Sequence, residues 1–256
     1  MLLNGLVYNI SVGTLIPVII FGVLATHLAY TIPSLYFTEK SNKKYFSYAG
    51  GGNKEVVVAI DLVGIFFSFL FFTTKGALLA ISLGILCILY FFGIKTAILR
   101  LRSLRSVPFL KSLIIPLIWA LTVVYLPLVH KSNEITLLGL VEVFRYFSFF
   151  LAIATIFDIA DTLFDIKNDL KTFPACLGIN ASRCVSISST LLYSLLTFVQ
   201  FGVSEVFAAA FITSIINSYH AMVASPKEQK SYSINWLDAT LIVQPAIYFL
   251  LKLYVS

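Results

Sequence analysis

Four aspartates follow one another at the end of an apolar segment: Asp158, Asp161, Asp165 and Asp169. On a continuous helix, at 100° per residue, their side chains would fall within an arc of about 80°. Like charges on one helix face repel each other, more strongly where water is scarce, so we expect a cation beside them. Carboxylate oxygens suit Mg²⁺, which typically takes one or two carboxylates and completes its shell with water and substrate phosphates.

A simpler interpretation of the acidic run stays open. Charged stretches between membrane spans are often solvated helix faces with no ligand. Against this interpretation, the run follows directly on an apolar segment, and its acids all point one way if the helix continues through them.

A basic segment lies upstream of the acids, in residues 98–111. It contains Arg100, Arg102, Arg105 and Lys111. Such residues commonly anchor a membrane protein at the cytoplasmic surface, whereas a cluster of them also binds phosphate oxygens. Carboxylates that hold Mg²⁺ beside basic residues would form a diphosphate site, in which the metal neutralises the phosphates and assists the departure of pyrophosphate.

The remainder of the chain has the composition of a membrane protein. Of its 256 residues, 59% are hydrophobic and 12% are charged, whereas soluble domains carry about 25% charged residues. Several apolar segments run without alternation, which predicts helices rather than barrel strands. We therefore expect an all-α polytopic bundle, a single integral-membrane domain over residues 1–256. It would contain about eight transmembrane helices, at residues 9–36, 56–73, 76–97, 108–128, 137–157, 184–202, 205–223 and 236–254.

The distribution of Lys and Arg predicts the orientation. If the loop after the first span is cytoplasmic, most of the 18 basic residues lie on that side. The cell inner membrane is the expected location, with the acidic run facing the cytoplasm. The net charge of +6 is explained by this topology and by attraction to anionic lipid and substrate, so nucleic acid is not an expected partner. The cytoplasmic loops would be about 38–55, 98–111, 158–183 and 224–235.

Polar residues inside the predicted spans are candidates for function, because ionisable groups are costly there. Glu142 and Arg145 are three residues apart and are placed to neutralise each other. Asp61 lies one turn into the second span, and Asp238 lies near the start of the last. Amide side chains that could line a cavity or bond between helices are Asn217, Gln200 and Gln244.

Residues 157–178 resemble the second aspartate-rich motif of the UbiA superfamily of membrane prenyltransferases. Matching positions are the acids Asp158, Asp161 and Asp165, the pair Lys171 and Thr172, and the tail residues Pro174 and Gly178. Residues 103–111 also resemble the family's loop between its fourth and fifth helices. The likeness extends over about residues 10–254, although only the 157–178 stretch is specific.

The resemblance implies transfer of a prenyl group from a prenyl diphosphate to a hydrophobic acceptor, either an aromatic, quinone-type molecule or a lipid. It implies Mg²⁺ as the cofactor and the lipid bilayer as the environment. The metal ligands and catalytic acids would be Asp158, Asp161 and Asp165. The diphosphate would be contacted by Lys171, Arg102 and Lys111.

The sequence departs from the family pattern in four respects. The family has nine helices, and eight are predicted here. Phe157 replaces an Asn of the motif, and Asp169 replaces a Gly. The first aspartate-rich motif should lie where the first span reaches the cytoplasm, yet residues 25–39 contain no Asp. A working transferase should therefore bring substitute polar groups from this segment close to the aspartates, namely His27, Tyr30, Ser34 and Glu39.

Two other functions remain open at this point. The missing first motif is consistent with a catalytically impaired relative that keeps the fold and has a binding or assembly role. A transporter with acids in its pathway is less well supported. Its acids would be expected near the midplane of the membrane, and its two halves would be expected to repeat.

Overall fold

The computed structural model describes residues 10–36, 54–92, 94–95, 100–101, 103–132, 137–226 and 238–255. The chain forms two compact units. The first comprises Met1–Phe91 and Thr122–Thr136, and the second comprises Phe92–Leu121 and Leu137–Ser256. The single domain expected from the sequence therefore stays a prediction.

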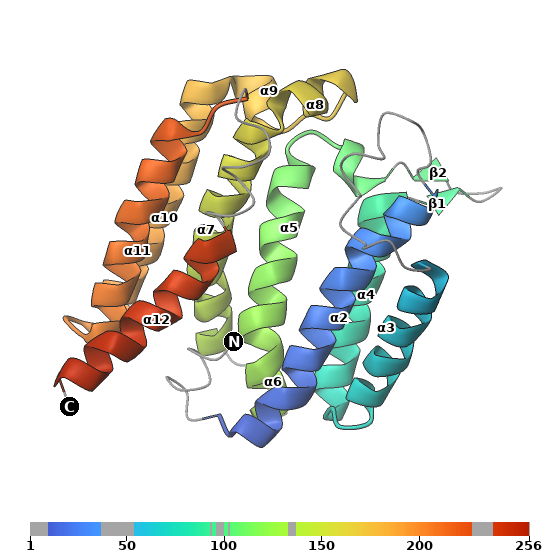
Figure 1. The fold of residues 1–256 in the computed structure, drawn as a ribbon, viewed down its shortest axis with the longest axis horizontal. Helices are drawn as coiled ribbons and strands as arrows, with labels where there is room; N and C mark the ends of the chain where they lie inside the picture. Colours follow the sequence, from blue (N-terminus) through green and yellow to red (C-terminus); the bar gives the residue numbers. More distant parts are fainter. Residues whose placement is uncertain are drawn as a thin grey trace. The chain divides into compact units, whose positions relative to one another are not determined.

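The first unit is built from apolar helices: α2 (Val12–Tyr36), α3 (Lys54–Phe69), α4 (Thr74–Phe92) and α6 (Leu126–Ser132). Helices α2 and α3 pack against each other (Figure 1). The core of the unit contains Val18, Phe21, Ala80 and Leu126. Large apolar side chains cover the outer faces, among them Ile60 and Phe67 at 63% and 56% exposed, which is the surface that a lipid environment stabilises.

The second unit contains five long helices: α5 (Leu110–Ala120), α7 (Leu137–Ala160), α10 (Ile179–Phe201), α11 (Glu205–Val223) and α12 (Asp238–Val255). Helix α10 packs between α7 and α11, and α11 also packs against α12 (Figure 1). Serine hydroxyls join these helices. Ser186 donates to the carbonyl of Ala152 at 2.9 Å, and Ser214 donates to that of Thr190 at 3.0 Å. Small hydroxyl residues are typical of helix contacts inside membranes.

Short elements complete the second unit. Between α7 and α10 lie α8 (Thr162–Lys167) and α9 (Phe173–Leu177). Before α5 lie a two-residue antiparallel strand pair, β1 (Ile94–Lys95) and β2 (Arg100–Leu101), and a 3-10 turn, η1 (Leu104–Ser106).

The predicted fold class is confirmed. Helix α5 continues through a π-helical turn, η2 (Leu121–Tyr125), into α6, so the described residues contain eight long helical segments. Five of these are long and apolar enough to cross a membrane, and shorter apolar helices lie at Gly13–Ala29 and Leu241–Leu253. The chain is an all-α polytopic membrane protein. The predicted loops at 38–55 and 224–235 fall largely outside the described residues.

The predicted neutralisation of Glu142 and Arg145 is confirmed within α7. Both side chains are fully buried, and Arg145 Nη2 lies 2.5 Å from Glu142 Oε2. Arg145 Nη1 also donates to the hydroxyl of Thr197 on α10 at 3.0 Å. The guanidinium carbon lies 4.6 Å from the ring centre of Tyr146 and 5.3 Å from that of Phe201. This network ties α7 to α10 with every charge compensated.

The other intramembrane polar residues have different outcomes. Asp61 is buried and accepts a 2.7 Å contact from His27 Nδ1, which joins α3 to α2. Gln244 donates to the hydroxyl of Tyr193, which joins α12 to α10. Asn217 is fully buried on α11, and within the described part of the chain neither of its amide atoms has a hydrogen-bond partner. The side chain of Asp238 lies outside the described part of the chain.

Candidate active site

The acidic run does not continue as one helix, contrary to the geometry assumed from its spacing. Helix α7 ends at Ala160, and α8 begins at Thr162. The hydroxyl of Thr162 donates to the carbonyls of Asp158 and Ile159 at 3.1 and 2.8 Å, and so occupies backbone acceptors at the end of α7. After α8 the chain reverses, and the amide of Leu170 donates to the carbonyl of Asp165 at 2.8 Å.

The break separates the four acids into different environments. Asp158 and Asp165 are buried, at 6% and 0% exposed. Asp161 is half-buried at the junction of α7 and α8, and Asp169 is exposed beyond α8. The expectation that all four face one way is therefore wrong for Asp169, because the chain has already turned away there.

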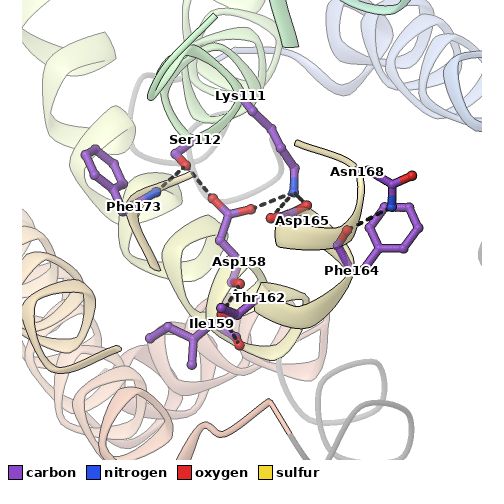
Figure 2. A network of polar contacts seen from close by, with 9 residues as sticks. All are labelled: Lys111, Ser112, Asp158, Ile159, Thr162, Phe164, Asp165, Asn168 and Phe173. Carbon is purple, nitrogen blue, oxygen red and sulfur yellow. Dashed lines mark hydrogen bonds and ion pairs between the residues drawn. The ribbon is translucent and has the colours of Figure 1, made fainter. Parts of the chain in front are cut away.

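The cation expected beside the acids is Lys111, near the start of α5 (Figure 2). Its ammonium nitrogen lies 2.7 Å from both carboxylate oxygens of Asp165 and 3.1 Å from Oδ1 of Asp158. The side chain of Lys111 is 13% exposed. Such charge-assisted bonds are stronger than neutral ones, and burial reduces their screening by water.

Ser112 completes the contacts of Asp158, a role that the sequence analysis missed. Its hydroxyl donates to Asp158 Oδ2 at 2.5 Å and accepts from the amide of Phe173 at 3.5 Å (Figure 2). Its place directly after Lys111 is the signal that could have identified it. The hydroxyl thereby connects α5, α7 and the start of α9.

The loop before α5 is held against the loop before α9. Phe109 has a φ of 63°, an unusual conformation for a residue with a bulky side chain. Its amide donates to the carbonyl of Lys171 at 2.7 Å, and its ring lies 5.4 Å from that of Phe173. Such strain persists only where the surrounding structure imposes it. The contact fixes Lys111 and Ser112 opposite the acids.

Burial raises the pKa of Asp161 to about 6, from an ordinary value of 3.8. Lys111 acts in the opposite direction, while Asp165 and Asp158 add to the increase. Burial also raises the pKa of Asp165, against the lowering effect of Lys111. Among the described residues, no side chain forms a hydrogen bond or ion pair with the Asp161 carboxylate. Of Asp158, Asp161 and Asp165, it is therefore the most open to an incoming cation.

The other predicted phosphate ligands have mixed outcomes. Lys171 is exposed, and its ammonium forms no ion pair within the described ranges. Arg102 lies outside the described residues. The neighbouring Thr172 is fully buried, and its hydroxyl acts on the carboxyl of Asp165 by lowering its pKa.

The donor chemistry of the site suits Mg²⁺, because hard oxygen ligands and two carboxylates are typical of its protein sites. The arrangement differs from a ready metal site in one respect. Lys111 occupies the position between Asp158 and Asp165 where a cation would lie. In the part of the chain that the structure describes, no three acidic, His or Cys side chains are grouped to hold a metal ion.

Of the four substitutes expected for the missing first motif, His27 is the one whose side chain lies in the described part of the chain. Glu39 and the side chains of Tyr30 and Ser34 lie outside the described part of the chain. His27 is described, and its Nδ1 is paired with Asp61.

A comparison with solved structures bears on the fold. The chain resembles a structure described as the apo form of a UbiA homolog from Aeropyrum pernix K1, with a TM-score of 0.72 and 16% identity. The match covers 97% of this chain and 94% of that one. No protein-family model and no curated protein matches the sequence. The resemblance inferred from residues 157–178 is confirmed at the level of the fold, and the chain has the all-α membrane fold of a UbiA homolog.

Proposed function

We propose that this protein is a membrane prenyltransferase of the UbiA superfamily. It would transfer a prenyl group from a prenyl diphosphate to a hydrophobic acceptor, an aromatic, quinone-type molecule or a lipid. The observation that carries the proposal is the buried contact of Lys111 with Asp158 and Asp165, beside the open carboxylate of Asp161. An ammonium and several carboxylates at the end of an apolar bundle are the groups that a metal-bound diphosphate requires.

The residues have separate roles in this mechanism. Asp158, Asp161 and Asp165 would hold Mg²⁺, which when bound neutralises the diphosphate and stabilises the departing pyrophosphate. Lys111 would donate to phosphate oxygens, and Lys171 and Arg102 would be further contacts of the diphosphate. The carbon–oxygen bond of the prenyl diphosphate breaks with both electrons on pyrophosphate. The prenyl carbon then bonds to the acceptor, which loses a proton.

The helices beside the site suit an allylic cation. Phe150 lies on α7 about 12 Å from Asp158, at a rise of 1.5 Å per residue. Its ring centre is 6.0 Å from that of Trp119 on α5, and the neighbouring Phe149 lies 5.0 Å from Tyr193 on α10. Aromatic faces stabilise cations without reacting as strong nucleophiles. The aromatic cluster therefore supports a path for the prenyl group within the second unit.

A turnover assay in detergent or nanodiscs tests the reaction. We expect the purified protein to release pyrophosphate from a prenyl diphosphate when Mg²⁺ and a quinone-type acceptor are present. EDTA or Asp165→Asn should reduce the rate at least about 100-fold, because a ligand at the developing charge is lost. Asp169→Asn is the matched control and should leave the rate unchanged, because Asp169 is exposed.

Two results would contradict this assignment. Turnover that is insensitive to both EDTA and Asp165→Asn would place the chemistry elsewhere. Tight binding of the prenyl diphosphate without turnover of any acceptor would favour the alternative, an impaired relative with a binding or assembly role.

The orientation is also a proposal: the acidic motif faces the cytoplasm from the cell inner membrane. Cys176 on α9 offers a native probe, because it is exposed and lies close to the motif in sequence. In a Cys87→Ser, Cys184→Ser background, a membrane-impermeant maleimide should label Cys176 in inverted vesicles and not in intact cells. Labelling in intact cells would contradict the proposed topology, because Cys176 would then face the outside of the cell.

A further inference from the structure

All four carboxylate oxygens of Asp158 and Asp165 already have a partner from the chain. Lys111 contacts both oxygens of Asp165 and Oδ1 of Asp158. Ser112 donates to the remaining oxygen, Oδ2 of Asp158 (Figure 2). A metal ion can therefore bind both carboxylates only if the ammonium of Lys111 moves away from them.

Because the ammonium of Lys111 has to move, neither Mg²⁺ nor diphosphate should bind well without the other. Mg²⁺ without diphosphate would displace Lys111 from the acids and leave a largely buried ammonium without its anions, which is costly. Diphosphate without Mg²⁺ would bring several negative charges towards a cluster in which three carboxylates already face one ammonium. When both arrive together, the metal compensates the acids and the phosphate oxygens accept the bonds from Lys111.

We propose that Lys111 makes this site selective for the magnesium complex of a diphosphate, because its ammonium holds the Asp158 and Asp165 pair until both ligands replace its contacts. The inference rests on the proposed function and adds a specificity-determining role for Lys111. Mg²⁺ and diphosphate then strengthen each other's binding by the same factor, as linkage requires.

Calorimetric titration of the full-length protein with Mg²⁺ and with inorganic pyrophosphate tests this role. In the wild type, we expect each ligand to bind at least about tenfold more tightly when the other is present, after correction for magnesium pyrophosphate formed in solution. Lys111→Met removes the charge and keeps the length of the side chain. It should tighten Mg²⁺ binding in the absence of pyrophosphate about tenfold, and weaken pyrophosphate binding in the presence of Mg²⁺ by a similar factor.

Two further variants serve as controls. Lys167→Met removes an exposed charge at the end of α8 and should change neither affinity. Lys111→Met combined with Asp161→Asn removes one charge of each sign, so the acid pair is freed while the charge balance of the cluster is kept. Compared with Asp161→Asn alone, it should bind Mg²⁺ more tightly without pyrophosphate, and it keeps the test available if Lys111→Met does not fold.

The outcomes separate this inference from the function on which it rests. If magnesium pyrophosphate binds the wild type but loss of Lys111 leaves Mg²⁺ binding unchanged or weaker, the selectivity role is wrong and the proposed function stands. If magnesium pyrophosphate does not bind the wild type at all, both proposals fall.

Discussion

Glu142→Gln should lower the free energy of unfolding by about 3 kcal/mol or more, because it leaves the buried guanidinium of Arg145 without its counter-charge. Arg145 is 1% exposed, and two of its nitrogens bond to Glu142. The remaining contacts to Thr197 and to three aromatic rings do not replace a carboxylate. Thermal or denaturant unfolding in a fixed detergent measures the change.

Removing both charges should have a much smaller effect. Glu142→Leu combined with Arg145→Leu leaves no uncompensated charge, and apolar replacements of buried ion pairs are often neutral. Asp169→Asn, at an exposed position, should stay within about 0.5 kcal/mol of the wild type. If the double variant is as unstable as Glu142→Gln, the network stabilises the fold through its shape and hydrogen bonds rather than through charge balance.

The sequence carries enough information to predict the helices and to single out the acidic segment. Both signals are local, because span length follows from apolar composition and the acids belong to one short segment. The need for a cation also follows from local spacing. Its identity does not, because Lys111 is 54 residues from Asp165, and Ser112 is 46 residues from Asp158. Those pairings depend on how α5 packs against α7, which periodicity does not specify.

The break at the end of α7 is a second feature that residue spacing did not predict. The helical arc drawn through the acids requires regular dihedral angles, whereas Thr162 bonds to two backbone carbonyls where α7 ends. The pairing of His27 with Asp61, 34 residues apart, was also not predictable from the local sequence. Thr162 therefore takes local backbone partners that compete with the regular helix, whereas His27 takes a partner that only the tertiary structure supplies.

One departure from the family motif has a conformational explanation. Asp169 stands where the motif has a glycine, and its φ is 52°. Glycine adopts this left-handed region without strain, and aspartate is among the few other residues that tolerate it. The substitution is therefore compatible with the turn that brings Leu170 back to Asp165, and it does not argue against a working site.

Asp161→Asn should stabilise the ligand-free protein above pH 6 and remove part of its pH dependence. The pKa of Asp161 is raised in the folded state, to about 6 from 3.8. Between these values the folded protein binds more protons than the unfolded chain, so stability falls as the pH rises and levels off above about pH 6. Asparagine carries no charge to desolvate, so the part of this decrease that comes from Asp161 should disappear in unfolding curves recorded from pH 4 to pH 8.

Asp165→Asn should have the opposite effect on stability. It removes both bonds from Lys111 and leaves this largely buried ammonium with Asp158 as its only ion-pair partner among the described residues, a loss that outweighs the relief of no longer desolvating the Asp165 carboxylate. Both variants should nevertheless weaken binding of magnesium pyrophosphate by about tenfold or more, since a charge-assisted ligand is worth about 1.5–3 kcal/mol. If the acids were only a solvated helix face, both variants would be slightly stabilising and neither would alter binding. Opposite signs of the stability change, with weaker binding in both, therefore distinguish a built site from a charged surface. Equal signs with unchanged binding would remove the acids from the mechanism.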